Sequence, residues 1–219
     1  QMEKHMNIGI LNLQYSNNFG AILCAYSIKY IIGENNTVCI VNYISDSSIN
    51  IIEKFQIFRN QFLNMGICAN TDIALSKFYA NLDAVVVGSD QVFRLAYNAV
   101  KSPNFMEWMH GKKLFISYAA SFGIDHFEGG SLARKKVGKL LSRFDAHSVR
   151  ESSGVHIMKN TFGLDAIQVL DPTLLLDPKD YQPIIDSEPC AQPEKYVGVM
   201  FLDDVHWDEF RALALYKKL

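Results

Sequence analysis

The sequence predicts an α/β fold, built on a doubly wound and mostly parallel sheet. Short runs rich in valine and isoleucine recur along the chain, and they do not alternate apolar with polar residues. Strands of that composition are buried on both faces, as in a parallel sheet covered by helices. Between the runs, apolar residues recur every three or four positions, as on the buried face of a helix. This alternation of strand and helix is typical of a Rossmann-like open sheet with right-handed crossovers.

Strands are predicted where an apolar run of six to ten residues is bounded by polar or turn-forming residues. The run "AVVVGS" is the clearest example, because its four apolar residues end at a glycine and a serine. The predicted strands are Met6–Leu13, Thr37–Ile44, Ala84–Ser89, Leu114–Ser121, Ala146–Glu151, Ile167–Leu176 and Tyr196–Leu202.

Helices are predicted from apolar spacing and from residues that start and stop helices. Thr71 followed by Asp72 is a start signal, and the helix that starts at Ser152 has Ser152 as its predicted cap and a stop signal at Gly163. The predicted helices are Asn18–Ile32, Ile49–Met65, Thr71–Tyr79, Phe127–Phe144, Ser152–Phe162 and Asp203–Leu219.

The chain organisation predicts one lobe and the beginning of another. Residues 1–176 form the Rossmann-like lobe, and residues 177–195, which hold four of the six prolines, form a linker. Residues 196–219 then open a second unit with one strand and one helix, which cannot close a core of their own. Either this unit packs on the first lobe, or the chain lacks most of a second lobe.

Composition excludes several classes of function. The formal net charge is −2 over 219 residues, so no overall positive field attracts nucleic acid. No stretch approaches the ~20 apolar residues of a membrane span. The cysteines lack the spacing of metal ligands and fit a reducing cytoplasm, so no metal site is predicted. They are Cys24, Cys39, Cys68 and Cys190, of which the first two are expected to be buried.

The first candidate site segment, "QYSNNFGA", lies between the first strand and the first helix. Asn17 or Asn18 would cap the helix, and Gly20 would let the backbone approach a ligand. The alternative is a capped turn with nothing bound. Neither the dinucleotide-binding glycine pattern nor a phosphate-loop lysine occurs here.

Two further segments follow the third and fourth strands. "VVGSDQVFR" ends its strand with Gly88, Ser89, Asp90 and Gln91, and polar residues at such a strand end favour a site wall. "YAASFG" contributes Ser121 among small residues, which leave room beside the strand end. Close helix packing explains those small residues equally well.

Arg150 is the candidate for binding an anion. It ends a predicted strand just before a predicted helix start, and an arginine fork suits phosphate or carboxylate. The alternative is a salt bridge with Glu151 or another carboxylate. Asp171, which precedes Pro172, is interpreted as a turn residue whose carboxylate Thr173 satisfies.

Taken together, five motifs resemble the polysaccharide pyruvyl transferase family. They are "NNFGAILCAYSI", "VVGSDQVFR", "ISYAASFG", "SVRESSGVHI" and "VLDPTLLL", in that order. The resemblance runs from about Met6 to about Leu176, and "YVGVMFLDD" resembles the start of the family's second lobe. It implies a GT-B-like fold, two Rossmann-type lobes with a cleft between them, of which this chain would supply the N-terminal lobe.

The resemblance also implies the reaction and its partners. The donor substrate is phosphoenolpyruvate, no other cofactor is expected, and the acceptor is a glycan or a lipid-linked sugar. Arg150 would grip the donor anion, while Asn17, Asn18 and Gly20 line the cleft from the first loop. Ser89, Asp90 and Gln91 would line it from the third strand, toward the acceptor sugar, and Gly88 and Ser121 would line it from the same strand ends. The expected location is the cytoplasm, with the inner face of the membrane as a further possibility.

Some residues depart from the family pattern. Cys24 stands where glutamine is common, and Phe93 where tryptophan is common. The catalytic histidine is expected in the second lobe, and His206 carries no motif that makes it that residue. The catalytic residues are therefore left open, and we expect the chain ending at Leu219 to have little or no transferase activity.

Two other classes of function remain open from the sequence. One is a GT-B glycosyltransferase that uses a nucleotide sugar. The other is a non-catalytic lobe that binds or oligomerises, since an apolar edge left exposed would favour a homo-oligomer.

Overall fold

The computed structural model describes residues 5–13, 15, 17–44, 52–96, 103–187 and 211. The chain divides into two compact units, Gln1–Tyr181 and Gln182–Leu219. In the second unit the described residues are helix α6 (Gln182–Ser187) and Arg211. The predicted strand Tyr196–Leu202 and most of the predicted helix Asp203–Leu219 lie outside the described residues. The predicted linker and second lobe therefore stay predictions.

The first unit is built on a parallel sheet, as predicted. Within the described residues the sheet has six strands in the order β2-β1-β3-β4-β5-β6, and every neighbouring pair is parallel. Each strand falls inside one of the predicted apolar runs. The strands are β1 (Asn7–Leu11), β2 (Thr37–Ile40), β3 (Ala84–Val87), β4 (Leu114–Ala120), β5 (Ala146–Val149) and β6 (Ile167–Gln168).

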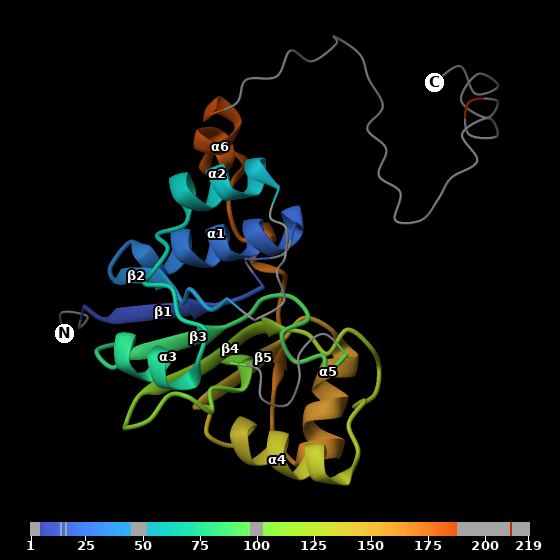
Figure 1. Cartoon of the computed structure of the whole chain (residues 1–219). Coiled ribbons are helices and arrows are strands. Elements are labelled where there is room, and N and C mark those ends of the chain that lie inside the picture. Colours follow the sequence, from blue (N-terminus) through green and yellow to red (C-terminus); the bar gives the residue numbers. More distant parts are fainter. Residues whose placement is uncertain are drawn as a thin grey trace. The chain divides into compact units, whose positions relative to one another are not determined.

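Helices cover both faces of this sheet, which makes it doubly wound. The connection from β1 to β2 runs in the opposite direction from the later ones, so right-handed crossovers send its helix to the other face. Accordingly, α1 lies on one side of the sheet, while α3, α4 and α5 lie on the other (Figure 1). The helices are α1 (Phe19–Gly33), α2 (Glu53–Phe62), α3 (Asp72–Phe78), α4 (Ser131–Leu141) and α5 (Ser152–Ile157).

Cap residues set several helix ends as the sequence predicts. The side chains of Asn18 and Thr71 accept hydrogen bonds from backbone N–H groups in the first turns of α1 and α3. After α5 a five-residue π-helical turn ends at Gly163, whose φ of 70° is left-handed. The predicted cap Ser152 is wrong, because Glu151 occupies the cap position and Ser152 is already helical.

Most predicted elements are shorter in the structure, and for two of them the sequence shows why. The run Ile167–Leu176 contributes only the two residues of β6, since Pro172, which lacks an N–H, starts a 3₁₀ turn (Pro172–Leu174). Helix α4 begins at Ser131 rather than at Phe127, because Gly129 and Gly130 precede it and favour no helix.

The core lies between β3 to β5 and the helices α4 and α5. Every residue of β3 is buried, and the ring of Phe93 contacts three other buried rings at centroid distances of 5.5 to 6.2 Å. On the other face, α2 packs on α1 through Phe19–Phe55 and Tyr26–Phe58 ring contacts.

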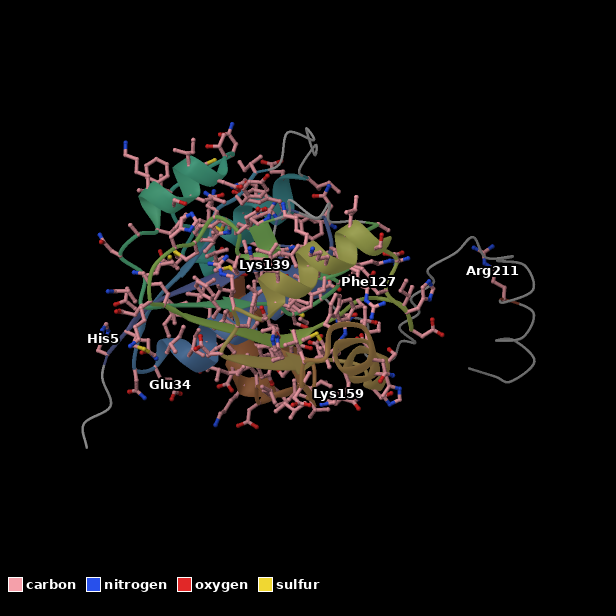
Figure 2. The ribbon with its side chains drawn as sticks, turned by 90° about the horizontal axis from the view of Figure 1, so that it is seen from below. His5, Glu34, Phe127, Lys139, Lys159 and Arg211 are labelled. Carbon is pink, nitrogen blue, oxygen red and sulfur yellow. The ribbon has the colours of Figure 1, made fainter. Side chains whose placement is uncertain are left out.

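The outer surface of the α4 layer is polar. Seen from below, the exposed side chains of Lys139, on α4, and Lys159 lie on the outside of the molecule (Figure 2). Among the described helices, none combines the length and the apolar composition needed to cross a lipid bilayer.

Candidate functional site

The candidate site lies at the carboxyl ends of the strands, next to the point where the strand order reverses. That point is between β1 and β3, where open α/β sheets bind ligands. The N–H of Gly88 donates to the carbonyl of Leu11 across it, at 3.0 Å. Gly88 has a φ of 124°, and a Cβ atom there would lie 2.2 Å from the carbonyl oxygen of Tyr118. The tight bend after β3 therefore requires glycine.

The backbone of Asp90 is fixed directly after this bend. Its carbonyl accepts hydrogen bonds from the N–H groups of Val92, at 2.7 Å, and Ser121, at 2.9 Å. Its φ is 77°, in the left-handed region. This conformation turns the Asp90 carboxylate toward the end of β5, where Oδ1 lies 3.6 Å from Nη2 of Arg150.

Arg150 stands among three carboxylates. Nε donates to Glu151 at 2.9 Å, Nη1 donates to Asp171 at 3.2 Å, and Nη2 faces Asp90. Burial disfavours the charge of Arg150, whose side chain is 28% exposed, but Glu151 and then Asp171 and Asp90 outweigh burial and raise its pKa. The salt bridge that the sequence offered as an alternative is thus present. One cation facing three carboxylates leaves the cluster formally negative.

Asp171 is the centre of the cluster. Its carboxylate accepts hydrogen bonds from the N–H of Thr173, at 3.0 Å, and from the Thr173 hydroxyl, at 2.7 Å, as predicted. It also accepts from Arg150, and Ser89 Oγ lies 3.4 Å away. Burial opposes ionisation of Asp171, but the hydrogen bonds from Thr173, Arg150 and Cys24 together lower its pKa. Asp171 is therefore a carboxylate at neutral pH.

Helix α1 reaches the cluster through Cys24. The buried thiol donates to the Asp171 carboxylate, with Sγ–O distances of 3.4 and 3.5 Å. Burial and the neighbouring Asp171 raise the pKa of Cys24, so it remains a protonated donor. The other thiol expected to be buried, Cys39, is only partly buried.

The remaining strand-end residues shape the backbone around the cluster. Ser89 is buried and its hydroxyl donates to the carbonyl of Ala119, at 2.9 Å. Ser121 is buried too, and its Oγ accepts from the N–H of Gly123, at 2.9 Å. Gln91 points toward Arg94, whose Nη1 donates to its side-chain oxygen at 2.9 Å.

The doubled asparagine joins the first loop to two helices. Asn18 caps α1 by accepting the N–H of Ala21 at 3.2 Å, and Asn17 accepts the N–H of Ile52, just before α2, at 3.1 Å. Both asparagines and Gly20 are exposed. Among the described contacts, none joins these residues directly to Arg150, whereas α1, which Asn18 caps, reaches the cluster through Cys24.

Sequence reasoning brought Arg150 and Asp90 together but did not place Asp171 in the site. Asp171 was interpreted as a turn residue, and Cys24 simply as a buried thiol. The signal that would have found Asp171 is its position, because it follows the last strand of a parallel sheet at the edge where Arg150 also lies.

A separate hollow lies at the other end of the sheet. Its volume is about 340 Å³, and Asn7 and Thr37, the first residues of β1 and β2, help to line it. Exposed Ile67 and Phe78 make part of its wall. In the part of the chain that the structure describes, no group of three or more His, Cys, Asp or Glu side chains could hold a metal ion.

Comparisons with known proteins identify the family. A search of curated proteins gives no match. One solved structure that matches is a pyridoxal kinase from Entamoeba histolytica, at 11% identity and a TM-score of 0.32. That match covers 84% of this chain but 61% of the kinase chain, and a similarity this weak carries no argument. The family model for polysaccharide pyruvyl transferase matches residues 18–219, most of the sequence. The chain therefore belongs to the polysaccharide pyruvyl transferase family.

Proposed function

We propose that the protein transfers the pyruvyl group of phosphoenolpyruvate to a sugar of a polysaccharide or of its lipid-linked precursor. The observation that carries this proposal is the match of residues 18–219 to the family model. The product is a ketal that bridges two sugar hydroxyls. Phosphoenolpyruvate is the donor substrate, and the proposal needs no other cofactor.

The chemistry makes three demands on the site. The enol carbon of the donor must gain a proton, which calls for a general acid. A sugar hydroxyl then attacks the neighbouring carbon, and attack by the second hydroxyl releases phosphate. The carboxylate and phosphate of the donor need cationic and N–H donors, which also stabilise the charges that develop.

Arg150 is the proposed donor-binding residue. It lies at the carboxyl edge of the sheet, and Asp90 from β3 approaches it to 3.6 Å. We assign Asn17, Asn18 and Gly20 to one wall of the substrate cleft. Gly88, Ser89, Asp90, Gln91 and Ser121 form the other wall, in which buried Ser89 and Ser121 fix the backbone.

The proposed location follows from the same reaction. A lipid-linked acceptor would bring the protein to the inner face of the membrane, while a soluble donor is supplied from the cytoplasm. Self-association remains a prediction, and light scattering of the purified chain would distinguish a monomer from a homo-oligomer.

Calorimetric titration with phosphoenolpyruvate tests the donor site. We expect the purified chain to bind it and Arg150→Ala to abolish measurable binding. Arg134→Ala, which removes an exposed arginine of α4, is the matched control and should bind like the wild type. Unchanged binding by Arg150→Ala would remove Arg150 from the site.

A second measurement tests the reaction itself. Phosphate release from phosphoenolpyruvate is followed with a panel of glycan acceptors. Release that depends on one acceptor would support the transferase and would overturn the expectation that the chain ending at Leu219 has little or no activity. A preference for nucleotide sugars over phosphoenolpyruvate in a thermal-shift screen would instead favour the glycosyltransferase.

A further inference from the structure

The three carboxylates around Arg150 differ in how firmly they are held. Glu151 and Asp171 each accept a hydrogen bond, from Nε and Nη1. Nη2 has a single neighbour of this kind among the described residues, the Asp90 carboxylate at 3.6 Å. That distance is too long for a hydrogen bond. The N–H groups of Nη2 therefore remain available to donate to a ligand.

Asp171 is held from several directions at once. Thr173 donates to it twice, Cys24 donates from α1, and Ser89 approaches from the end of β3. A carboxylate with so many donors keeps its place when a ligand arrives. Its hydrogen bond to Nη1 consequently fixes the plane of the Arg150 guanidinium, and with it the direction of the Nη2 edge.

Asp90 is held differently. Its backbone is fixed by Val92 and Ser121, but among the described residues its carboxylate accepts no hydrogen bond. The side chain is 20% exposed and faces the edge of Arg150 that an anion would need. A donor anion bound at Nη2 would lie next to the Asp90 carboxylate, and the two negative charges would repel each other. The donor anion and the Asp90 carboxylate therefore compete for one position.

We propose that the two aspartates have opposite roles: Asp171 positions Arg150 for the donor, whereas Asp90 occupies the place that the donor's anionic group takes. This inference rests on the proposed function, because it assumes that phosphoenolpyruvate binds at Arg150. On binding, Asp90 turns away from Nη2 while Asp171 stays in contact with Nη1. Glu151, whose side chain is 39% exposed, binds the far edge of the guanidinium and takes no part in the exchange.

Two neutral variants separate these roles. Asp90→Asn and Asp171→Asn each remove one negative charge next to Arg150 and keep the side-chain size, so simple charge removal would tighten anion binding in both. We expect Asp90→Asn to bind phosphoenolpyruvate about three- to tenfold more tightly, and this gain should be smaller at high salt, which screens the repulsion that the variant removes. We expect Asp171→Asn to bind it at least about tenfold more weakly. Asp165→Asn, at an exposed carboxylate that pairs with Lys159, is the control and should bind within about twofold of the wild type.

Titration calorimetry with phosphoenolpyruvate, repeated with inorganic phosphate, measures these changes. Thermal melting confirms that each variant is folded. Asp171→Glu is the second test of positioning, because it keeps the charge but moves the carboxylate, and it too should weaken binding. Tighter binding by Asp171→Asn would overturn the positioning role, and weaker binding by Asp90→Asn would overturn the competition.

The two proposals fail in different ways. If the wild type binds phosphoenolpyruvate and Arg150→Ala does not, the donor site stands, and equal changes in both aspartate variants overturn only this inference. If neither the wild type nor any variant binds the donor, the donor site is overturned and this inference with it.

Discussion

Arg150 donates a 3.2 Å hydrogen bond to Asp171. Arg150 follows β5 and Asp171 follows β6, so this contact ties the ends of the last two strands together. Because Asp171 also accepts from Cys24, it ties them to α1 as well. A single carboxylate thus joins the ends of two strands to a helix that covers one face of the sheet.

Replacing Asp171 with asparagine should lower the free energy of unfolding by about 1.5–3 kcal/mol, the usual range for hydrogen bonds to a charged group. The loss arises because Arg150 and Thr173 would then donate to an uncharged amide oxygen, which is a weaker acceptor than the carboxylate. Urea unfolding at pH 7 measures it. Asp165→Asn is the control, since that exposed carboxylate pairs with exposed Lys159 and should matter little.

The stability difference between the wild type and Asp171→Asn should also depend on pH. Because the folded-state pKa of Asp171 is lowered, the contribution of its ionised carboxylate to stability is complete above the ordinary aspartate pKa of about 3.9. It is lost as pH falls below that value toward the folded-state pKa. The difference in stability between wild type and Asp171→Asn should therefore shrink at pH 3, and a constant difference would contradict the lowered pKa.

The sequence predicts most of the fold because its signals are local. Uniform apolar runs mark the strands, and Asn18 and Thr71 mark helix starts through contacts three residues away. The meeting of Asp90 with Arg150 also follows from sequence, since all carboxyl ends of a parallel sheet share one edge.

Most of what the sequence does not predict depends on contacts between distant segments. The end of the last apolar run is an exception, because Pro172 and the local hydrogen bonds of Asp171 turn the chain out of the sheet there. Which partner Asp171 then takes depends on the packing of α1, which presents Cys24. Glu151 takes the cap position of α5, which the sequence assigns to Ser152, while its side chain forms the salt bridge with Arg150 that the sequence offered as an alternative.

His147 should make the fold sensitive to mild acid. Its ring stacks on Phe144 at a centroid distance of 5.3 Å, and burial lowers its pKa, outweighing the opposite effect of the nearby Leu141 backbone. Below the ordinary histidine pKa of about 6.5 the unfolded chain binds the proton more readily, so stability falls as pH falls. The slope is at most about 1.4 kcal/mol per pH unit.

Urea unfolding at pH 5.5 and 7.5 measures this effect. His147→Gln should remove much of the difference between the two pH values, whereas His156→Gln, at an exposed position of α5, should leave it unchanged. An equal pH dependence in wild type and His147→Gln would show that other groups cause it.

Gly88→Ala should damage the site by damaging the bend after β3. The new Cβ would overlap the carbonyl oxygen of Tyr118, and the φ of 124° is strained for alanine. We expect a loss of about 3 kcal/mol or more, or failure to fold, in thermal melting. Gly33→Ala, in the last turn of α1 with open space around it, should instead be neutral or slightly stabilising.

Cys24 should react very slowly with alkylating reagents in the folded protein. Burial and the Asp171 carboxylate raise its pKa, and only the thiolate reacts readily with iodoacetamide. Exposed Cys68 should therefore be alkylated at least about a hundredfold faster at pH 8, as measured by peptide mass spectrometry. In urea, where α1 no longer shields the thiol, the two cysteines should react at similar rates. Equal rates in the folded protein would mean that Cys24 is not held as a donor to Asp171, and the contact between α1 and the Arg150 cluster would have to be abandoned.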